Sequence, residues 1–193
     1  MSQPEELIAA LGPVVAILNE LEVRHYVGGS VASSFHGAVR STMDVDIVCE
    51  LGNEDIERIL QSLATDYYAS EPAIREAVKN RSCFNLIHLP TSFKVDVFIS
   101  RGRAFDRDCM DRCKLEVLSE QLQVRIATPE DSIVAKLEWY RAGNEVSERQ
   151  WDDVTKLMRL LGDDADMDYL TLAAASVGVS DLLERLRRAR DRK

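Results

Sequence analysis

The chain has 193 residues and a formal net charge of −9. This charge argues against a protein that binds nucleic acid through an overall positive field, although a local basic path is still possible. This length supplies a core for one domain, or for one domain with a small appendage. Because no apolar run reaches membrane-spanning length, the start MSQPEEL is acidic and the four cysteines show no disulfide framework, we expect a cytoplasmic protein without a membrane partner.

The first part of the chain predicts a helix, a short strand and a turn. Apolar periodicity indicates a helix over 5–21, interrupted or bent at Gly12-Pro13, and a strand is expected over 25–27. The strand ends at Gly28-Gly29, and Ser30 is a candidate N-cap of a short helix. Since a glycine pair lets the backbone approach an anion and a helix start offers free N–H groups, this turn is a candidate phosphate site.

Two apolar runs that carry aspartates come next. Strands are expected over 43–49 and 93–99, because apolar and polar residues alternate there with a period of two. Asp44 and Asp46 then project from one face, and Asp96 lies within about 5 Å of them if the two strands are neighbours. Carboxylates this close repel one another unless a cation neutralises them, and hard oxygen ligands suit Mg²⁺. The cluster therefore predicts a metal site.

The other elements follow from hydrophobic spacing, turn residues and capping signals. Between the two acidic strands and after them, we expect helices over 54–63 and 71–79, strands over 66–69, 83–89, 115–118 and 124–126, and a hairpin turn at 90–92. From residue 128 the pattern is helical, with helices over 128–141, 147–161, 168–176 and 180–190. The expected fold is α/β (α+β): a mixed sheet with flanking helices over 1–126, followed by a small helical subdomain over 127–193, with a ligand cleft between them.

The order of these motifs resembles a known superfamily. Gly28-Gly29-Ser30, then Asp44-Val45-Asp46, then Val95-Asp96-Val97 is similar to the signature of the nucleotidyltransferase superfamily, which has the DNA polymerase β-like fold. The run RSTMDVDIV resembles the Arg-x-Thr-x-Asp-x-Asp form of small bacterial stand-alone members, among them the AbiEii-like type IV toxins. The likeness extends into TPEDSIVAKLEWYRAG and SERQWDDVTKLM and covers roughly residues 24–160.

The resemblance implies an enzyme that uses Mg²⁺, with Mn²⁺ as a substitute, to transfer a nucleoside monophosphate from a nucleoside triphosphate to an acceptor hydroxyl. In that scheme Asp44 and Asp46 bind two metal ions, and Asp96 completes the shell of the second ion and favours deprotonation of the hydroxyl. The turn Gly28-Gly29-Ser30 holds the triphosphate tail.

Three further residues are assigned to nucleotide binding. Arg40 stands four residues before the first aspartate, where it would neutralise phosphate charge or pair with a nearby acid. Lys136 and Asp153 match a Lys and a later Asp of the family's helical segment, with Asp152 as the alternative one residue away. Because a cation in an apolar helical stretch needs a partner, Lys136 either finds one or extends to the helix border.

RNA is the leading expectation for the acceptor. The toxin group implies RNA, with a tRNA end as a candidate and a cognate antitoxin as a partner, while a protein side chain or a small molecule such as an aminoglycoside is the alternative. A third possibility is a non-catalytic nucleotide-binding module on the same fold. A nucleic-acid acceptor predicts a basic groove leading to Asp96, and a small acceptor predicts a closed acidic pocket. The basic residues of the C-terminal end, 185–193, are either a solvated helix end or a polyanion contact.

Overall fold

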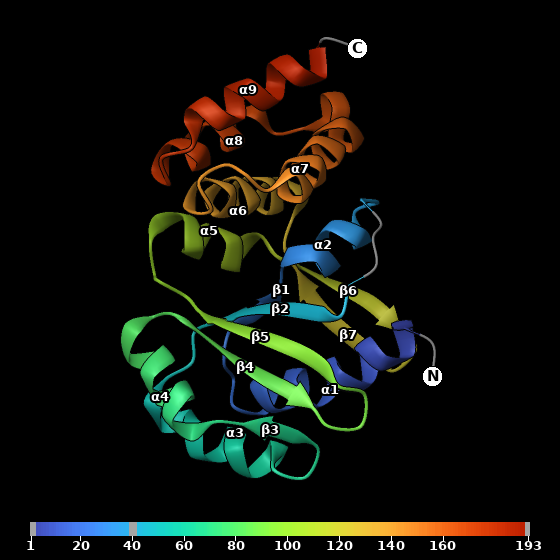
Figure 1. The fold of residues 1–193 in the computed structure, drawn as a ribbon, viewed down its shortest axis with the longest axis vertical. Coiled ribbons are helices and arrows are strands. Elements are labelled where there is room, and N and C mark those ends of the chain that lie inside the picture. Colours follow the sequence, from blue (N-terminus) through green and yellow to red (C-terminus); the bar gives the residue numbers. More distant parts are fainter. Residues whose placement is uncertain (1–2, 39–41, 192–193) are drawn as a thin grey trace.

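The computed structural model describes residues 3–38 and 42–191 (Figure 1). Its helices are α1 (Gln3–Glu20), α2 (Gly29–Phe35), α3 (Ile56–Leu63), α4 (Glu71–Asn80), α5 (Ala104–Arg112), α6 (Pro129–Ala142), α7 (Glu148–Leu161), α8 (Met167–Ser176) and α9 (Ser180–Asp191), with short 3₁₀ turns at Asn53–Asp55 and Gly162–Asp164. Its strands are β1 (His25–Val27), β2 (Asp44–Cys49), β3 (Tyr67–Ala69), β4 (Cys83–His88), β5 (Phe93–Ile99), β6 (Lys114–Ser119) and β7 (Leu122–Ile126).

These strands form one mixed sheet in the order β3-β4-β5-β2-β1-β7-β6, which confirms the expected mixed α/β class. The central strand β2 runs parallel to β5 and antiparallel to β1. Along β2 the side chains alternate between burial and partial exposure, so Val45, Ile47 and Cys49 face the core while Asp44 and Asp46 face the opposite side. The sheet therefore has one apolar face and one face that carries acids.

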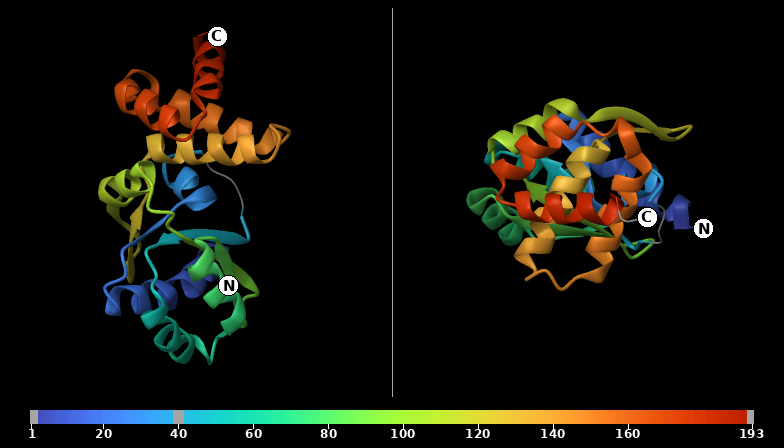
Figure 2. Two further views of the ribbon diagram at one scale, coloured as in Figure 1. Left: turned by 90° about the vertical axis from the view of Figure 1, so that its left-hand side faces the viewer. Right: turned by 90° about the horizontal axis from the view of Figure 1, so that it is seen from above.

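Helices cover both faces of the sheet. Figure 1 places α1 and α3 on the apolar face, and α2, α5 and α6 on the acidic face. Helices α6 to α9 form a layer at one end of the molecule, with α9 farthest from the sheet (Figure 2). The last strand ends at Ile126 and only helices follow among the described residues, as expected. Whether the two predicted parts, 1–126 and 127–193, fold separately stays a prediction.

Capping signals locate the helices of this upper layer. Thr128 and Ser147 accept hydrogen bonds from the N–H groups three residues ahead, and they begin α6 and α7 as expected from the sequence. Ile133, Val134 and Leu137 of α6 are fully buried, because this helix lies between α2 below it and α7 and α8 above it. Helix α6 is thus the roof of any space left above the acidic face of the sheet.

Three details of the sequence prediction are wrong. Helix α5 was not predicted at all, because only a few of its residues are apolar. Ser30 is not the N-cap of α2, since that helix begins at Gly29 with Gly28 in the N-cap position. Helix α1 is not interrupted, because Pro13 lies on its exposed side, where a carbonyl that loses its helical partner can bond to water. The alternative expectation of a bend at Gly12-Pro13 stays a prediction.

In the part of the chain that the structure describes, none of the helices combines the length and the apolar character needed to span a bilayer.

Two leucines of α8 allow the effect of core packing on stability to be measured separately from the effect of helix propensity. Leu170 is fully buried and Leu172 is 72% exposed on the same helix. We expect Leu170→Ala to lower the free energy of unfolding by about 3 kcal/mol, because it removes buried methyl groups and leaves a cavity. Leu172→Ala should change it by less than about 0.5 kcal/mol. Urea denaturation followed by circular dichroism measures both, and equal losses would contradict the packing described for the upper layer.

Candidate functional site

The site begins with the register between β2 and β5. Asp46 lies directly opposite Asp96, and Asp44 lies opposite Lys94. Asn85 of β4 is the next residue in the same row, opposite Asp96 on its other side. Since neighbouring strands lie about 4.8 Å apart, the carboxylates of Asp46 and Asp96 share one small area of the sheet face. The expected proximity of the aspartates is confirmed.

Two of the carboxylates already have partners. Asp96 accepts a hydrogen bond from the side chain of Asn85 and forms an ion pair of 2.7 Å with the Nζ of Lys94. Asp44 accepts a hydrogen bond from the hydroxyl of Thr42. With these side-chain positions, no group of three or more His, Cys, Asp or Glu within residues 3–38 and 42–191 is arranged to hold a metal ion. The predicted three-ligand centre stays a prediction.

The position of Asp46 is unfavourable for a charged group. Burial and the negative charges of Asp44 and Asp96 raise the pKa of Asp46 to about 6, while Lys136 and Lys94 act in the opposite direction. A carboxyl in this state is neutralised either by a proton or by a cation. The acidic face therefore favours the arrival of positive charge at Asp46.

The glycine turn lies directly against Asp46. The N–H of Gly28 donates a 2.9 Å hydrogen bond to the backbone oxygen of Asp46, and Gly29 has a φ of +57°. A Cβ at position 29 would overlap Oδ2 of Asp46, so only glycine fits there. The anion that the turn approaches in the structure is thus a carboxylate of the protein itself, and Ser30 is buried beside it.

The helical layer contributes a buried ion pair. Nζ of Lys136 on α6 lies 2.8 Å from Oδ2 of Asp153 on α7, and the two residues are only 9% and 4% exposed. Asp152 points to solvent instead. The structure therefore supplies the partner that Lys136 was expected to need, and of the two aspartates only Asp153 faces inward. Arg40 lies outside the described residues.

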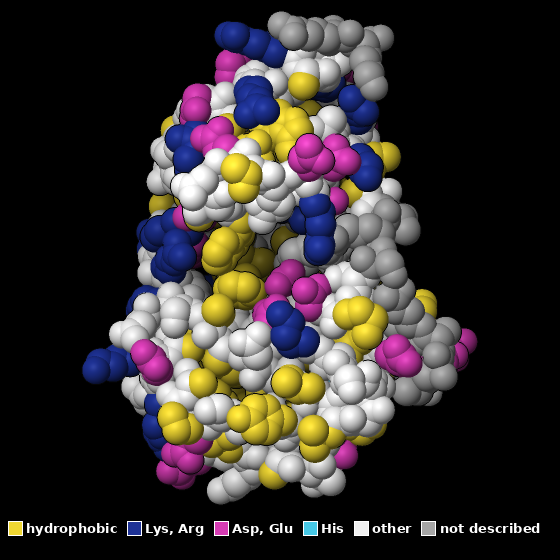
Figure 3. All heavy atoms as spheres, in the orientation of Figure 1, with side chains coloured by type: hydrophobic (Ala, Val, Ile, Leu, Met, Phe, Trp, Pro, Cys, Tyr) yellow, Lys and Arg dark blue, Asp and Glu magenta, His cyan; other side chains and the backbone are white. Residues whose placement is uncertain are grey.

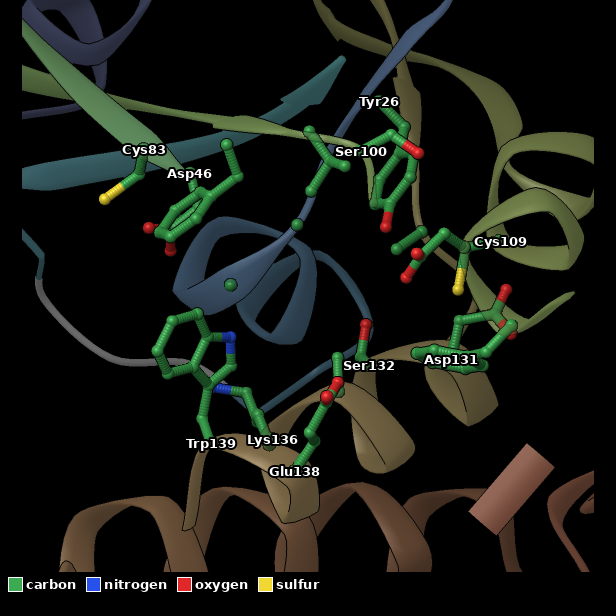
Figure 4. Close-up of a pocket in the computed structure, with 18 of the residues that line it drawn as sticks. Tyr26, Asp46, Cys83, Ser100, Cys109, Asp131, Ser132, Lys136, Glu138 and Trp139 are labelled. Atoms are coloured by element: carbon green, nitrogen blue, oxygen red, sulfur yellow. The ribbon is translucent and has the colours of Figure 1, made fainter. Parts of the chain in front are cut away.

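A cavity of about 620 Å³ lies between the acidic face of the sheet and helices α6 and α7. Figure 3 shows the hollow near the middle of one face of the molecule, with apolar side chains in it and acidic side chains at its edge. In Figure 4, Asp46 points from the sheet toward Lys136 and Trp139 of α6 across the cavity. Of the predicted site residues, those that line it are Gly28, Gly29, Ser30, Asp44, Asp46, Lys136 and Asp153. Among the described residues, Asp96 is not part of this lining.

Other lining residues escaped the sequence analysis. Trp139 packs edge-on against Phe98 at the cavity. The sequence pattern of its helix indicated only that the apolar residues belong to the core. Glu138 binds Arg103 from the loop before α5, a contact between residues far apart in the chain. Arg149 of α7 also lines the cavity, and its place one turn before Asp153 was the signal that could have identified it.

The close approach at position 29 can be tested by Gly29→Ala. We expect a loss of at least about 2 kcal/mol in the free energy of unfolding, since the new Cβ meets Asp46 and the positive φ is strained. Gly12→Ala is the control, because nothing lies within 4 Å of its added Cβ in α1 and alanine favours helix. This control should be neutral or stabilising in the same thermal and urea measurements. A Gly29→Ala protein as stable as the wild type would refute the contact.

The raised pKa of Asp46 predicts a pH dependence for the metal-free protein. Because the folded carboxyl holds its proton up to about pH 6 and the unfolded one only to about pH 4, its contribution to stability is complete below pH 4 and is lost as the pH rises through 6. Asp46→Asn cannot ionise, so in EDTA it should gain stability over the wild type between pH 4 and 8, by about 3 kcal/mol at most. Urea titrations at several pH values measure this gain. Asp152→Asn controls for the loss of one negative charge, and parallel curves for wild type and Asp46→Asn would contradict the prediction.

Comparison with known proteins supports the fold alone. No family model matches the chain, and no curated protein matches it. Among solved structures, the chain is similar to an antigenic nucleotidyltransferase-like protein from Paracoccidioides brasiliensis, with a TM-score of 0.54, 15% identity, and coverage of 95% of this chain and 93% of that one. It is also similar to ANT(2'')-Ia in complex with adenylyl-2''-tobramycin, with a TM-score of 0.56, 12% identity, and coverage of 88% and 95%. At this level of identity the likeness establishes a nucleotidyltransferase-like fold, the fold that the motifs predicted.

Proposed function

We propose that this protein is a nucleotidyltransferase that moves a nucleoside monophosphate from a nucleoside triphosphate to an acceptor hydroxyl. One observation carries the proposal: Asp46 and Asp96 lie in register on the open face of the sheet, and Asp46 lines a cavity roofed by the Lys136–Asp153 ion pair. Paired carboxylates, a buried cation and a cavity of about 620 Å³ are the groups needed to bind a triphosphate and a metal.

The side chains on the acidic face fit Mg²⁺, or Mn²⁺ in its place. Asp44, Asp46 and Asp96 offer only hard oxygen donors, and the raised pKa of Asp46 supports the proposal because a bound cation would neutralise the repulsion among them. An ammonium group, Nζ of Lys94, already pairs with Asp96, and the Lys94 side chain is 41% exposed and free to move toward solvent. When bound, the metal would neutralise phosphate charge and lower the pKa of the acceptor hydroxyl.

In the proposed reaction each of these residues has a separate role. The Gly28-Gly29-Ser30 turn and Lys136 would hold the triphosphate, since they line the cavity around Asp46. Asp96 would receive the proton of the acceptor hydroxyl, whose oxygen attacks the α-phosphorus. The bond from that phosphorus to the bridging oxygen breaks, pyrophosphate leaves, and the nucleotide remains on the acceptor. Asp153 would orient Lys136 through their 2.8 Å contact.

A small-molecule acceptor is favoured by the pairing of the cations around the cavity. Arg101 and Arg103 both bind Glu138, and Arg103 also binds Asp106. Near Asp96 the cation Lys94 is paired as well. Because Arg101, Arg103 and Lys136 are neutralised in this way, Arg81 and Arg149 are the lining cations of the described chain that would remain for a nucleic-acid backbone. The similar protein ANT(2'')-Ia was solved with adenylyl-2''-tobramycin, a small molecule that carries a nucleotide.

Transfer to RNA or a tRNA end, or to a protein side chain, remains the second proposal, with a cognate antitoxin as its partner in the toxin-like form. The arginines of α9 weaken the RNA option. Arg185 lies over the ring of Trp151 at 4.1 Å and near Glu145, while Arg187 and Arg188 pair with Glu184. Part of their charge is therefore compensated within the helical layer.

The proposal is tested by labelling. The protein is incubated with Mg²⁺ and each of the four α-labelled nucleoside triphosphates, together with total RNA, cell protein, or a panel of hydroxyl-rich small molecules that includes aminoglycosides. We expect label to move onto a small molecule, with release of pyrophosphate. Asp46→Asn should reduce the rate by more than about 100-fold, because a metal ligand is lost.

The matched control is Asp152→Asn, which removes an exposed acid of the neighbouring α7 and should leave the rate unchanged. Label on RNA or protein would replace the small acceptor with the second proposal. Transfer that survives Asp46→Asn would overturn the assigned mechanism, and nucleotide binding without any transfer would indicate a non-catalytic module.

A further inference from the structure

We propose that Asp131 and Ser132 select the nucleobase of the bound triphosphate. Asp131 accepts a hydrogen bond from an exocyclic amino group of the base, and Ser132 donates one to the adjacent ring nitrogen of the same edge. Adenine and cytosine have this edge, and hypoxanthine and uracil do not. The inference rests on the proposed nucleotide transfer and adds the base preference of the same cavity.

Two buried polar side chains that line the cavity, Asp131 and Ser132, each have one oxygen without a hydrogen-bond partner among the described residues. Asp131 is 1% exposed and Ser132 is 4% exposed, and both line the cavity. The two oxygens are Oδ2 of Asp131 and Oγ of Ser132, and neither finds a partner within residues 3–38 and 42–191. Figure 4 shows both on α6, on the side of the cavity near Tyr26 and Cys109 and away from Asp46. Buried polar atoms are nearly always paired, so these two indicate a ligand that supplies the partners.

The orientation of the Asp131 carboxylate is held from outside the cavity. Its Oδ1 accepts a hydrogen bond from the hydroxyl of Tyr169 on α8 and lies 3.5 Å from Nε of Arg112 on α5. The guanidinium of Arg112 rests 3.7 Å from the centre of the Tyr169 ring. Because these contacts use one oxygen, the other is left to the cavity. Burial raises the pKa of Asp131, whereas Tyr169, Thr128 and Arg112 favour its charged form. In that charged form, a carboxylate held in this way is a fixed hydrogen-bond acceptor.

The part of the cavity beside Asp131 and Ser132, called the recess below, lies where the base of a triphosphate bound at Asp46 would reach. One step along the strands from Asp46, the sheet face carries an apolar row that ends near Tyr26, with Val48 opposite Phe98 on one side and opposite Tyr26 on the other. This step is about 7 Å. The row extends toward β1, whereas Asp96 lies on β5, on the other side of β2. A triphosphate anchored at Asp46 therefore places its base over the apolar row, and the acceptor approaches from the side of Asp96.

The donors and acceptors of this recess fit one type of base edge. Oδ2 of Asp131 accepts from the amino group of adenine or cytosine, and the hydroxyl of Ser132 donates to the adjacent ring nitrogen. In hypoxanthine and uracil an oxo group replaces the amino group, so two oxygens with lone pairs would face each other without a proton between them. A site that leaves a buried polar group unpaired discriminates strongly against that ligand.

The test compares nucleotides that differ at this edge. Binding of ATP, inosine triphosphate, CTP and UTP to the full chain is measured by calorimetry at pH 8 with Mg²⁺ and no acceptor. We expect ATP to bind at least about tenfold more tightly than inosine triphosphate, and CTP more tightly than UTP by a similar factor. Equal affinities within each pair in the wild type would overturn the inference.

The variant Asp131→Asn tests the base preference more directly than the wild-type affinities do. Because Tyr169 donates to the side-chain oxygen at that position, the amide N–H₂ of the variant would face the cavity and donate to an oxo group. The preference for ATP over inosine triphosphate should then disappear or reverse, whereas a residue that only stabilises the fold would weaken both nucleotides equally. Asp152→Asn is the control and should keep the wild-type ratio.

Ser132→Ala keeps the inference testable if Asp131→Asn does not fold. It removes one hydroxyl, and the ratio of ATP to inosine triphosphate affinities should fall by about threefold or more. An unchanged ratio in this variant would contradict the inference. Failure of the proposed function is a different result. A wild type that binds none of the four nucleotides loses both proposals, whereas one that binds them without transferring a nucleotide loses only the transfer.

Discussion

The parallel pairing of β2 with β5 determines the rest of the site. Because side chains alternate along a strand, a slip of one residue in β2 would turn Asp46 into the core and bring Val45 to the open face, and the same slip in β5 would do so for Asp96 and Val95. Both valines are fully buried, so this slip would exchange apolar burial for buried charge. The hydrophobic face of the sheet thus holds the acidic face in register, although the two faces share no side chain.

The acidic face opposes the stability of the fold that positions it. Asp46 is partly buried beside two other carboxylates, and Gly29 packs so closely on it that no larger residue fits. Lys94 and Lys136 offset part of this repulsion, one from the sheet and one from the roof. Such local conflict between charge and burial is expected where a protein binds a ligand of opposite charge, because selection for binding tolerates a cost in stability.

Much of this arrangement could be predicted from local pattern. The period of two around Asp46 and Asp96 predicted both strands and their faces, and Thr128 and Ser147 predicted the starts of α6 and α7. Helix α5 could not be predicted, since its run AFDRDCMDR is mostly charged and owes its place to a short buried face around Phe105. Its amphipathic signal is shorter than a reliable helical window.

The recess at Asp131 escaped the sequence analysis for a different reason: its meaning depends on Tyr169 and Arg112, which meet it only in three dimensions. Its spacing nevertheless follows from the helix. Ser132 precedes Lys136 by four residues, so both lie on one side of α6, about 6 Å apart along the axis. The step from Asp46 to the apolar row below is about 7 Å. The two steps are nearly equal in length, so in the proposed binding mode a ligand with its phosphate between Asp46 and Lys136 would bring its base toward Ser132.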